Sequence, residues 1–484
     1  MTDHASTLGH IKDVTVLTAA LDMAPHLIDW RKRHTGQAEC VVFPSTTQAV
    51  SEVMAYCHAN RIRVFPQGGN TSVCGGSVPD GQGGSIVLNL SRMNRLREIN
   101  PDDDSMVVDA GCILANVQQA AADVDRLFPL RLGAEGSCQI GGNIATNAGG
   151  TAAVRYGVMR DLVLGLEVVL PDGTIIDAIK TVRKDNSGFD LKHLFIGSEG
   201  TIGIITGAAL KLFARPRGMT TAALAIRDID TALYIARDLR GALPGEISAL
   251  ELLSDSEMEI VREFRAEGAL RMRQAPWYLI VEVGGRSTEA EYRDILETLL
   301  MPELESGALT DAILAENERQ RGEIWGVRHS VTECNMHAGM GLTHDIAVPI
   351  GKLDQYIKQA EAELAEAYPD AVPVVVGHIG DGNLHYIAMF THEAWAAQTA
   401  QEAVRDHVGH MFYDIAVGLG GTFSAEHGVG SIHTGDMERY KSSSSLRMMR
   451  DMKAAFDPLG IANPGRMLKF SIDENALGGE IENE

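Results

Sequence analysis

The sequence predicts an α+β protein built from two main domains. Its 484 residues are more than a single domain usually holds, and 45% of them are hydrophobic, which is enough for large cores. Residues 38–65 show a strand-helix-strand pattern, and glycine-rich loops follow it. Beyond about Arg217 the composition shifts toward Glu, Leu and Arg, and strands again alternate with helices. Both halves are therefore expected to pack helices against sheets.

The N-terminal segment, residues 1–36, is predicted to be helical. Val14, Leu17 and Leu21 are spaced for one face of a helix. The basic cluster at residues 31–34 marks either a solvated helix end or a contact to an anion. The first main domain is expected to span residues 37–217.

This domain opens with a strand, a helix that starts at the capping residues Ser45 and Thr46, and a second strand. Pro171-Asp172-Gly173 lies between two apolar runs and predicts a hairpin. The elements expected in this domain are strands at 38–43 and 61–65, helices at 46–57 and 113–127, and the hairpin strands at 163–170 and 174–178.

Three stretches of the first domain are rich in glycine and small residues: 66–77, 133–150 and 195–205. Glycine lets a backbone approach a ligand closely, and clustered N–H groups bind anions. Residues 66–77 would suit a pyrophosphate, although a plain surface loop has a similar composition. The chain contains neither a P-loop nor a Gly-x-Gly-x-x-Gly motif, so direct use of NAD is not expected.

The second domain is expected to span residues 218–455, and residues 456–484 form a C-terminal tail. The predicted elements of the second domain are strands at 221–226 and 277–284 and helices at 229–242, 289–299 and 446–456.

Composition excludes several classes of protein. The net charge of −23 argues against a nucleic-acid partner. The six cysteines form no Cys-x-x-Cys pair, which argues against a disulfide framework or a thiolate metal site. The sequence shows neither a secretory signal pattern nor an apolar run long enough to span a membrane. We therefore expect a cytoplasmic protein with no membrane span.

Two histidines flank the turn Asp381-Gly382-Asn383, which lies between predicted strands at 372–376 and 386–390. They are His378 and His385, and Glu426-His427 follows a second glycine-rich turn. Two imidazoles and a carboxylate can form an open divalent-metal site, beside which His427 would stand as a free base. Alternatively, the histidines are ordinary core residues and Glu426 is a surface acid, because the spacing matches no compact metal motif.

Taken in order, these stretches resemble one family over nearly the whole chain. The matching stretches are 66–77, 133–150, 197–206, 378–385, 426–430 and 463–465. The chain resembles flavoproteins of the vanillyl-alcohol-oxidase/PCMH superfamily, within the D-2-hydroxyacid dehydrogenase group. That group includes D-2-hydroxyglutarate dehydrogenase, D-lactate dehydrogenase and the glycolate oxidase D-type subunit. The resemblance implies a two-part PCMH-type FAD-binding domain, a cap domain for substrate and metal, and a tail that returns to the flavin.

The resemblance also implies which residues bind FAD. They are Pro66, Gly68, Gly69, Asn70, Thr71, Gly75, Gly76, Ser77, Gly136, Ser137, Gly141, Gly142, Thr146, Gly149, Glu199, Gly200, Ile204 and Asn463. Members that attach flavin covalently often carry histidine where this chain has Asn70, so non-covalent FAD is expected.

For the chemistry, the resemblance implies a divalent ion, usually zinc, held by His378, His385 and Glu426. The ion would lower the pKa of the substrate 2-hydroxyl, and His427 would take its proton. The C2 hydrogen would leave as hydride to flavin N5, since the cofactor is the electron acceptor. The expected reaction is oxidation of a D-2-hydroxy acid to the 2-oxo acid.

Substrate recognition is expected from Arg328, which can bind a carboxylate bidentately, and from Thr332 on the same helical face. The chain departs from the hydroxyglutarate branch at two positions: Thr343 stands where lysine is usual, and Ile387 where asparagine is usual. Ile387 resembles the lactate and glycolate branches instead. His344 or His433 could compensate for these losses.

Other readings remain open. The flavin could pass its electrons to oxygen, as in an oxidase, or to a protein or quinone acceptor. The chain could also be a non-catalytic flavin-binding subunit, although it retains all the metal ligands and the base. A metal hydrolase without flavin would leave the glycine-rich loops unexplained. A homodimer is expected by resemblance alone.

Overall fold

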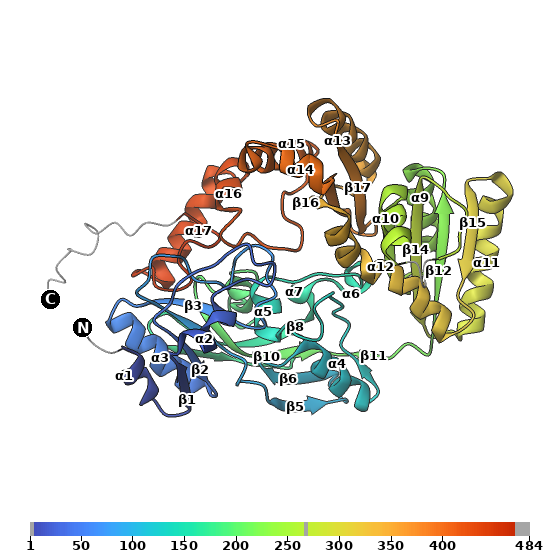
Figure 1. Ribbon diagram of the computed structural model, residues 1–484. Helices are drawn as coiled ribbons and strands as arrows, with labels where there is room; N and C mark the ends of the chain where they lie inside the picture. Colours follow the sequence, from blue (N-terminus) through green and yellow to red (C-terminus); the bar gives the residue numbers. More distant parts are fainter. Residues whose placement is uncertain (1–3, 266–269, 470–484) are drawn as a thin grey trace.

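The computed structural model describes residues 4–265 and 270–469 (Figure 1). The first half of the chain folds around two adjacent sheets, and the second half contains a separate seven-stranded sheet. The observed α+β architecture agrees with the prediction. No helix among the described residues is long and apolar enough to cross a membrane.

The first sheet has the strand order β1-β2-β4-β3. Strands β2 and β3 both run parallel to β4, which lies between them. The predicted strand-helix-strand unit is confirmed, and Thr46 caps its helix by accepting a hydrogen bond from the Ala49 N–H. The elements are β1 (Val14–Leu17), β2 (Cys40–Pro44), α3 (Thr47–Ala59), β3 (Arg63–Gln67) and β4 (Ser85–Asn89).

The prediction of a helical segment over residues 1–36 is wrong. Over the described residues 4–36 the chain forms short pieces, and β1 pairs antiparallel with β2. Three consecutive residues of β1, Val14, Thr15 and Val16, are β-branched, which favours an extended backbone. The other pieces are α1 (His4–Gly9), α2 (Ala20–Met23) and the 3₁₀ turn η1 (Ala24–His26).

The second sheet has the order β5-β6-β10-β8-β9 and is antiparallel throughout. It shares one hydrophobic core with the first sheet, as Val64, Leu88, Val108 and Ile204 illustrate. The predicted hairpin is β8–β9. The elements are β5 (Leu96–Asn100), β6 (Ser105–Asp109), α4 (Leu114–Asp123), β7 (Arg126–Leu127), α5 (Ile140–Ala145), α6 (Ala153–Tyr156), α7 (Met159–Leu162), β8 (Val163–Val169), β9 (Ile175–Ala178), α8 (Lys192–Phe195), β10 (Ile204–Lys211) and β11 (Phe213–Ala214).

The seven-stranded sheet has the order β15-β12-β14-β13-β17-β18-β16, and every pair of neighbours is antiparallel. Helices α9, α11, α13 and α15 pack on one face, and α10 and α12 pack on the other. The strands are β12 (Gly218–Ile226), β13 (Ile247–Ser254), β14 (Trp277–Gly285), β15 (Leu309–Leu314), β16 (Met340–Ala347), β17 (Ala371–His378) and β18 (Asn383–Phe390). The helices are α9 (Ile229–Ala242), α10 (Asp255–Phe264), α11 (Glu289–Ser306), α12 (Glu318–Ala338), η2 (Ile350–Lys352), α13 (Leu353–Ala367), α14 (His392–Ala397) and α15 (Gln401–Gly418).

The last helices, α16 (Thr434–Tyr440) and α17 (Ser443–Phe456), lead the chain back to the first half (Figure 1). The Asn463 N–H donates to the Val64 carbonyl at 2.8 Å, beside β3. The buried Lys453 ammonium donates to the Thr201 and Ala462 carbonyls at 2.6 and 2.7 Å. The tail predicted for residues 456–484 therefore returns to the first half; its residues 470–484 lie outside the described part of the chain.

Candidate active site

A cavity of about 1360 Å³ lies between the two halves of the chain. It is larger than the roughly 300–1,000 Å³ typical of pockets for drug-sized ligands, so it has room for a dinucleotide cofactor with substrate. All but one of the residues predicted to bind FAD line it, together with His378, His385, Glu426, His427, Arg328 and Thr332. The exception is Gly75, whose Cβ position faces Ser431 instead of the cavity.

The glycine-rich loops form the cofactor side of the cavity by packing backbone against backbone. A Cβ on Gly69 would lie 2.0 Å from the Ser137 carbonyl oxygen, and one on Gly200 would lie 2.6 Å from Pro66 Cγ. Gly200 also has a positive φ of 71°, which favours glycine. By contrast, a Cβ on Gly136 or Gly142 would meet no atom within 4 Å. Gly69 and Gly200 therefore allow the loops to pack closely together, and Gly136 and Gly142 leave room for a ligand.

Gln139 and Asn463 also lie on this side of the cavity. Among the described residues, Gln139 Oε1 and Asn463 Oδ1 are buried without a hydrogen-bond partner. The Asn463 amide donates to the Glu199 and Gly76 carbonyls at 2.6 and 3.1 Å. Asn463 thereby connects the C-terminal tail to two of the glycine-rich loops on the cofactor side.

The Glu199 carboxylate connects the cofactor loops to the loop after Glu426. It is buried and accepts hydrogen bonds from the Val429 and Gly430 N–H groups at 2.7 and 2.8 Å. Burial raises its pKa despite these hydrogen bonds. The prediction that Glu199 belongs to the cofactor region agrees with its position on the cavity wall.

The opposite wall carries the predicted metal ligands. His378 ends β17, His385 lies on β18, and Glu426 comes from the loop after α15. His378 Nε2 and His385 Nε2 lie 3.7 and 3.9 Å from the two oxygens of Glu426, and the candidate ligand atoms all fall within 4.8 Å of one another. Ligands bound to one tetrahedral zinc ion lie about 3.4 Å apart, so small side-chain movements would suffice.

Two further carboxylates stand behind the imidazoles. Glu251 on β13 accepts a hydrogen bond from His378 Nδ1 at 2.6 Å, and Asp345 Oδ1 on β16 lies 3.6 Å from His385 Nδ1. A carboxylate behind a histidine leaves Nε2 as the metal-binding atom, which is the usual arrangement in metal sites. The residues present therefore fit a divalent cation.

Electrostatics in the cluster also favours a cation. Burial opposes a charge on His378, but attraction from Glu251 and Glu426 outweighs it and raises the His378 pKa to about 9. Burial lowers the pKa of His385 to about 3, which leaves that imidazole neutral. Burial also raises the pKa of Glu426. The negative potential that attracts a proton to His378 equally attracts a metal ion.

His427 lies next to this cluster. Its ring stacks on that of His385 at 5.4 Å, with an angle of 14° between the planes. Its Nδ1 lies 3.6 Å from Asp345 Oδ2, an oxygen that also accepts the N–H groups of Ala425, Glu426 and His427. Attraction from His427 and His385 and these backbone hydrogen bonds outweigh burial and hold the pKa of Asp345 well below its usual range. Asp345 thereby fixes the loop that presents Glu426 and His427.

Helix α12 supplies the predicted substrate residues. Arg328 and Thr332 line the cavity, and Arg328 Nε donates to Glu251 at 2.7 Å. Trp325, one turn earlier, also lines the cavity and donates from Nε1 to Glu282 at 2.7 Å. The opposite half contributes Arg131, whose guanidinium pairs with Glu282 at 3.2 Å. Sequence reasoning missed Glu251, Glu282 and Arg131, because only strand pairing and domain contact bring them to the site.

Three predicted substrate residues do not line the cavity. The prediction for His344 is wrong: it is buried on the opposite face of the sheet, where its ring packs against Phe412 and Tyr413. Adjacent residues of a strand point to opposite faces, so His344 faces away from the side that carries His385 and Asp345. Ile387 is buried against Val374 and Met389, and Thr343 pairs with it across the strands. His433, offered as an alternative, pairs with Asp436 outside the cavity lining.

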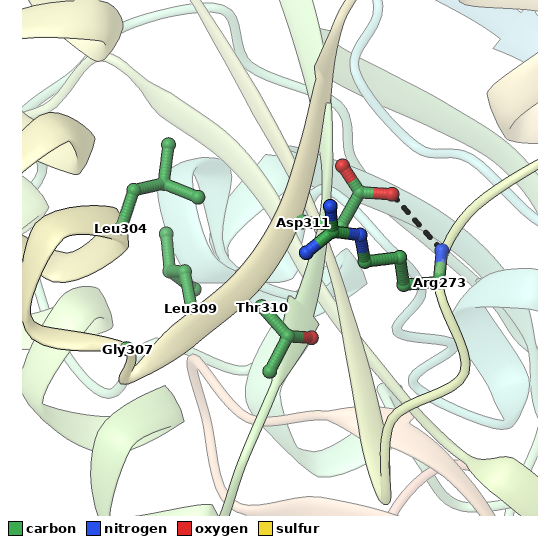
Figure 2. Close-up of a pocket in the computed structure, with 6 residues that line it drawn as sticks. All are labelled: Arg273, Leu304, Gly307, Leu309, Thr310 and Asp311. Carbon is green, nitrogen blue, oxygen red and sulfur yellow. Dashed lines mark hydrogen bonds between the residues drawn. The ribbon is translucent and has the colours of Figure 1, made fainter.

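A smaller hollow of about 490 Å³ lies at the edge strand β15 (Figure 2). Its lining includes Leu304, Leu309 and Asp311, and Asp311 accepts a hydrogen bond from the Arg273 backbone N–H at 2.9 Å. No histidine and no glycine-rich backbone loop lines it. The candidate active site is therefore the large cavity between the halves.

Comparison with known proteins agrees with this cavity and fold. Residues 38–178 match an FAD binding domain, and residues 215–467 match the C-terminal domain of FAD linked oxidases. The solved structure of p-cresol methylhydroxylase superposes with a TM-score of 0.72 at 14% identity, covering 93% of both chains. Alkyldihydroxyacetonephosphate synthase gives a TM-score of 0.70 at 17% identity, covering 93% of this chain and 82% of that one. At these identities the solved structures establish the fold alone.

Curated relatives are more similar in sequence. The mitochondrial D-2-hydroxyglutarate dehydrogenase of Bos taurus is 36% identical over 467 residues, covering 96% of this chain and 83% of that protein. A putative mitochondrial D-lactate dehydrogenase of Schizosaccharomyces pombe is 35% identical, covering 92% and 85%. The mitochondrial D-2-hydroxyglutarate dehydrogenase of Arabidopsis thaliana is 33% identical, covering 92% and 78%.

Fold and cavity together define an FAD-binding oxidoreductase with a PCMH-type cofactor domain. More particularly, the chain belongs to the family of FAD linked oxidases, in the group that contains the D-2-hydroxyglutarate and D-lactate dehydrogenases.

Proposed function

We propose that this protein oxidises a D-2-hydroxy acid to the corresponding 2-oxo acid, with D-2-hydroxyglutarate as the first candidate substrate. The observation that carries the proposal is the convergence on one cavity wall of His378, His385, Glu426, His427 and Arg328. They face the glycine-rich loops that fit FAD across the same cavity. The named activities of the relatives support the same substrate class.

Bound FAD would supply the acceptor for the two electrons removed from C2 of the substrate. A divalent ion, which we propose to be zinc held by His378, His385 and Glu426, would polarise the 2-hydroxyl. His427 is the proposed base: Asp345 lies beside its Nδ1, so Nε2 is the nitrogen that takes the hydroxyl proton. The Asp345 carboxylate then stabilises the protonated ring by its charge.

Arg328 is the proposed carboxylate-binding cation. Its Nε is already bonded to Glu251, which leaves both terminal NH₂ groups to grip a substrate carboxylate. Thr332 lies four residues on, on the same helical face, and can add a hydroxyl donor. Holding the carboxylate here and the hydroxyl beside His427 fixes two of the four groups on C2. With FAD on the other side of the cavity as the third point, only one enantiomer would direct its C2 hydrogen toward the flavin.

A smaller or less polar acid, such as D-lactate, is the second candidate. Thr343 and Ile387 offer neither the cation nor the amide expected in the hydroxyglutarate branch, although both lie outside the cavity lining. One relative is named as a putative D-lactate dehydrogenase.

We also propose how the flavin is bound, how the chain is divided and assembled, and where the protein works. Asn70 supports non-covalent FAD, since its side chain is engaged by the Ile28 carbonyl at 2.8 Å and by the Ser77 hydroxyl at 2.9 Å. We further propose domain boundaries near residues 36, 217 and 455, a homodimer, a cytoplasmic location, and a protein or quinone as electron acceptor.

Anaerobic bleaching of the flavin band tests the proposal. Purified protein is mixed with D- and L-2-hydroxyglutarate, lactate, malate and glycolate, with and without prior treatment with a chelator. We expect one or more D-acids to bleach the flavin, and the bleaching to disappear after chelation and return with Zn²⁺. A yellow protein that no acid bleaches would refute the substrate class. Bleaching that persists after verified removal of metal would refute the proposed role of the metal ion.

A further inference from the structure

One buried carboxylate joins the metal-binding wall to the substrate-binding helix. Glu251 lies on β13 directly opposite His378 on β17, and its side chain is fully buried. Its Oε1 accepts from His378 Nδ1 at 2.6 Å, and its Oε2 accepts from Arg328 Nε at 2.7 Å. Each oxygen therefore serves a different part of the candidate site.

We propose that Glu251 is a positioning residue that sets the orientation of a metal ligand and of the carboxylate-binding arginine at the same time. The inference rests on the proposed function, because it assumes that His378 binds metal and Arg328 binds substrate. It adds that the two subsites are mechanically linked: a change at Glu251 displaces both, although Glu251 is absent from the cavity lining.

Position 251 requires a carboxylate, because both of its partners donate hydrogen bonds. The bond to Glu251 keeps a proton of His378 on Nδ1, so Nε2, which faces Glu426, is the nitrogen whose proton a metal ion would replace. Arg328 Nε–H is also a donor, so both neighbours of Glu251 donate, and only a group with two acceptor oxygens satisfies both. Glutamine at position 251 would place its NH₂ group against one of these donors. One of the two contacts must then be lost.

The chain offers a matched control in Glu257 on α10. It is also fully buried and lies in the layer of helices that covers the same face of the sheet. Its Oε2 accepts from the Asn335 amide at 2.9 Å, and it neither contacts the histidine cluster nor lines the cavity. Glu257→Gln therefore makes the same change of side chain in a similar environment without removing either hydrogen bond of the proposed link, although it removes a carboxylate whose charge acts on Arg328.

The first measurement is the Zn²⁺ affinity of FAD-loaded, chelator-treated protein, determined by competition with a chromophoric chelator. Glu251→Gln is expected to weaken Zn²⁺ binding about 10–100-fold relative to wild type, as losses of such outer partners usually do. Glu257→Gln is expected to bind Zn²⁺ as wild type does. Wild-type affinity in Glu251→Gln would overturn the proposal.

The second measurement is steady-state kinetics at saturating Zn²⁺, with the acid that bleaches the wild-type flavin. Glu251→Gln is expected to raise KM about tenfold or more, because Arg328 loses its anchor. A wild-type KM would overturn the link to Arg328 even if Zn²⁺ binding is weakened. If wild-type protein itself binds no Zn²⁺, or if no acid bleaches its flavin, the proposed function fails instead.

A second variant covers the case in which Glu251→Gln does not fold. Glu251→Asp keeps the buried charge but is one methylene too short to reach both partners. It is expected to weaken Zn²⁺ binding or raise KM at least about threefold. Wild-type values of both quantities in Glu251→Asp would overturn the proposal.

Discussion

Replacing His344 with phenylalanine separates a core role from a substrate role. In the structure His344 is 6% exposed, packs edge-on against Phe412 and Tyr413, and, among the described residues, its Nδ1 has no hydrogen-bond partner. Burial lowers its pKa from 6.5 to about 4. Phenylalanine has a similar shape and no titrating group, so it removes this effect with little change in packing.

The sign and size of the effect follow from linkage. A histidine whose pKa is lower in the folded state contributes stability above pH 6.5 and loses it as the pH falls toward 4. The full loss is roughly 3 kcal/mol, since one pKa unit corresponds to about 1.4 kcal/mol. Between pH 7.5 and 5.0 the loss is about 2 kcal/mol, because at pH 5.0 the unfolded histidine is almost fully protonated.

The assay is urea unfolding at pH 7.5 and 5.0. Between these pH values, the free energy of unfolding should fall by about 2 kcal/mol less for His344→Phe than for wild type. His392→Gln, an exposed position at the start of α14, should behave as wild type. Equal pH dependence of His344→Phe and wild type would refute the core role. A tenfold loss of kcat/KM would instead support the substrate role predicted from sequence.

Three further predictions concern the cavity itself. Arg328→Met should lower kcat/KM about 10²-fold or more, because it removes the proposed carboxylate-binding cation; an unchanged value would place recognition elsewhere. His427→Ala should slow anaerobic flavin reduction about 10²–10⁴-fold in a stopped-flow mixer while the bound flavin absorbance stays at its wild-type level. Near-normal reduction would remove His427 as the base. Gly69→Ala should lose FAD and about 1–3 kcal/mol of stability, because the new Cβ would lie 2.0 Å from the Ser137 oxygen. Gly81→Ala, which meets open space, is its control, and equal flavin content in the two variants would contradict the loop packing.

The parts of the site that are formed by residues close together in the sequence could be predicted from the sequence. The β17–β18 hairpin follows from two apolar strands around Asp381-Gly382-Asn383, so His378 and His385 had to end near each other. The glycine-rich loops likewise revealed the cofactor wall, because small residues over long stretches are rare inside a domain.

Two errors arose where the alternation of a strand was not taken into account. Val14, Leu17 and Leu21 satisfy a helical spacing, yet pairing with β2 determines the structure of a strand this short. His344 lies next to Asp345 in sequence, and the alternation of a strand could have assigned it to the other face. In both cases an extended backbone would have been the better assumption.

Other parts of the site follow only from tertiary contacts. Nothing near residue 251 in the sequence indicates metal or substrate, and its role depends on β13 pairing with β17 and on α12 lying over that face. Glu282 and Arg131 meet because one wall of the cavity comes from each half of the chain.

The two halves contribute different groups to the cavity. This difference explains how cations can line the cavity of a chain with a net charge of −23. The first half contributes mainly glycine-rich backbone to the cavity wall. This backbone carries no net charge and can lie directly against a flavin. The cap contributes Arg328, whose partner Glu251 is buried and absent from the cavity lining, and the first half contributes Arg131, whose partner Glu282 does line the cavity. At the Arg328–Glu251 pair, only the cation is therefore presented to substrate. An acidic protein can thereby present a single cation to a substrate carboxylate inside a cavity that also holds carboxylates.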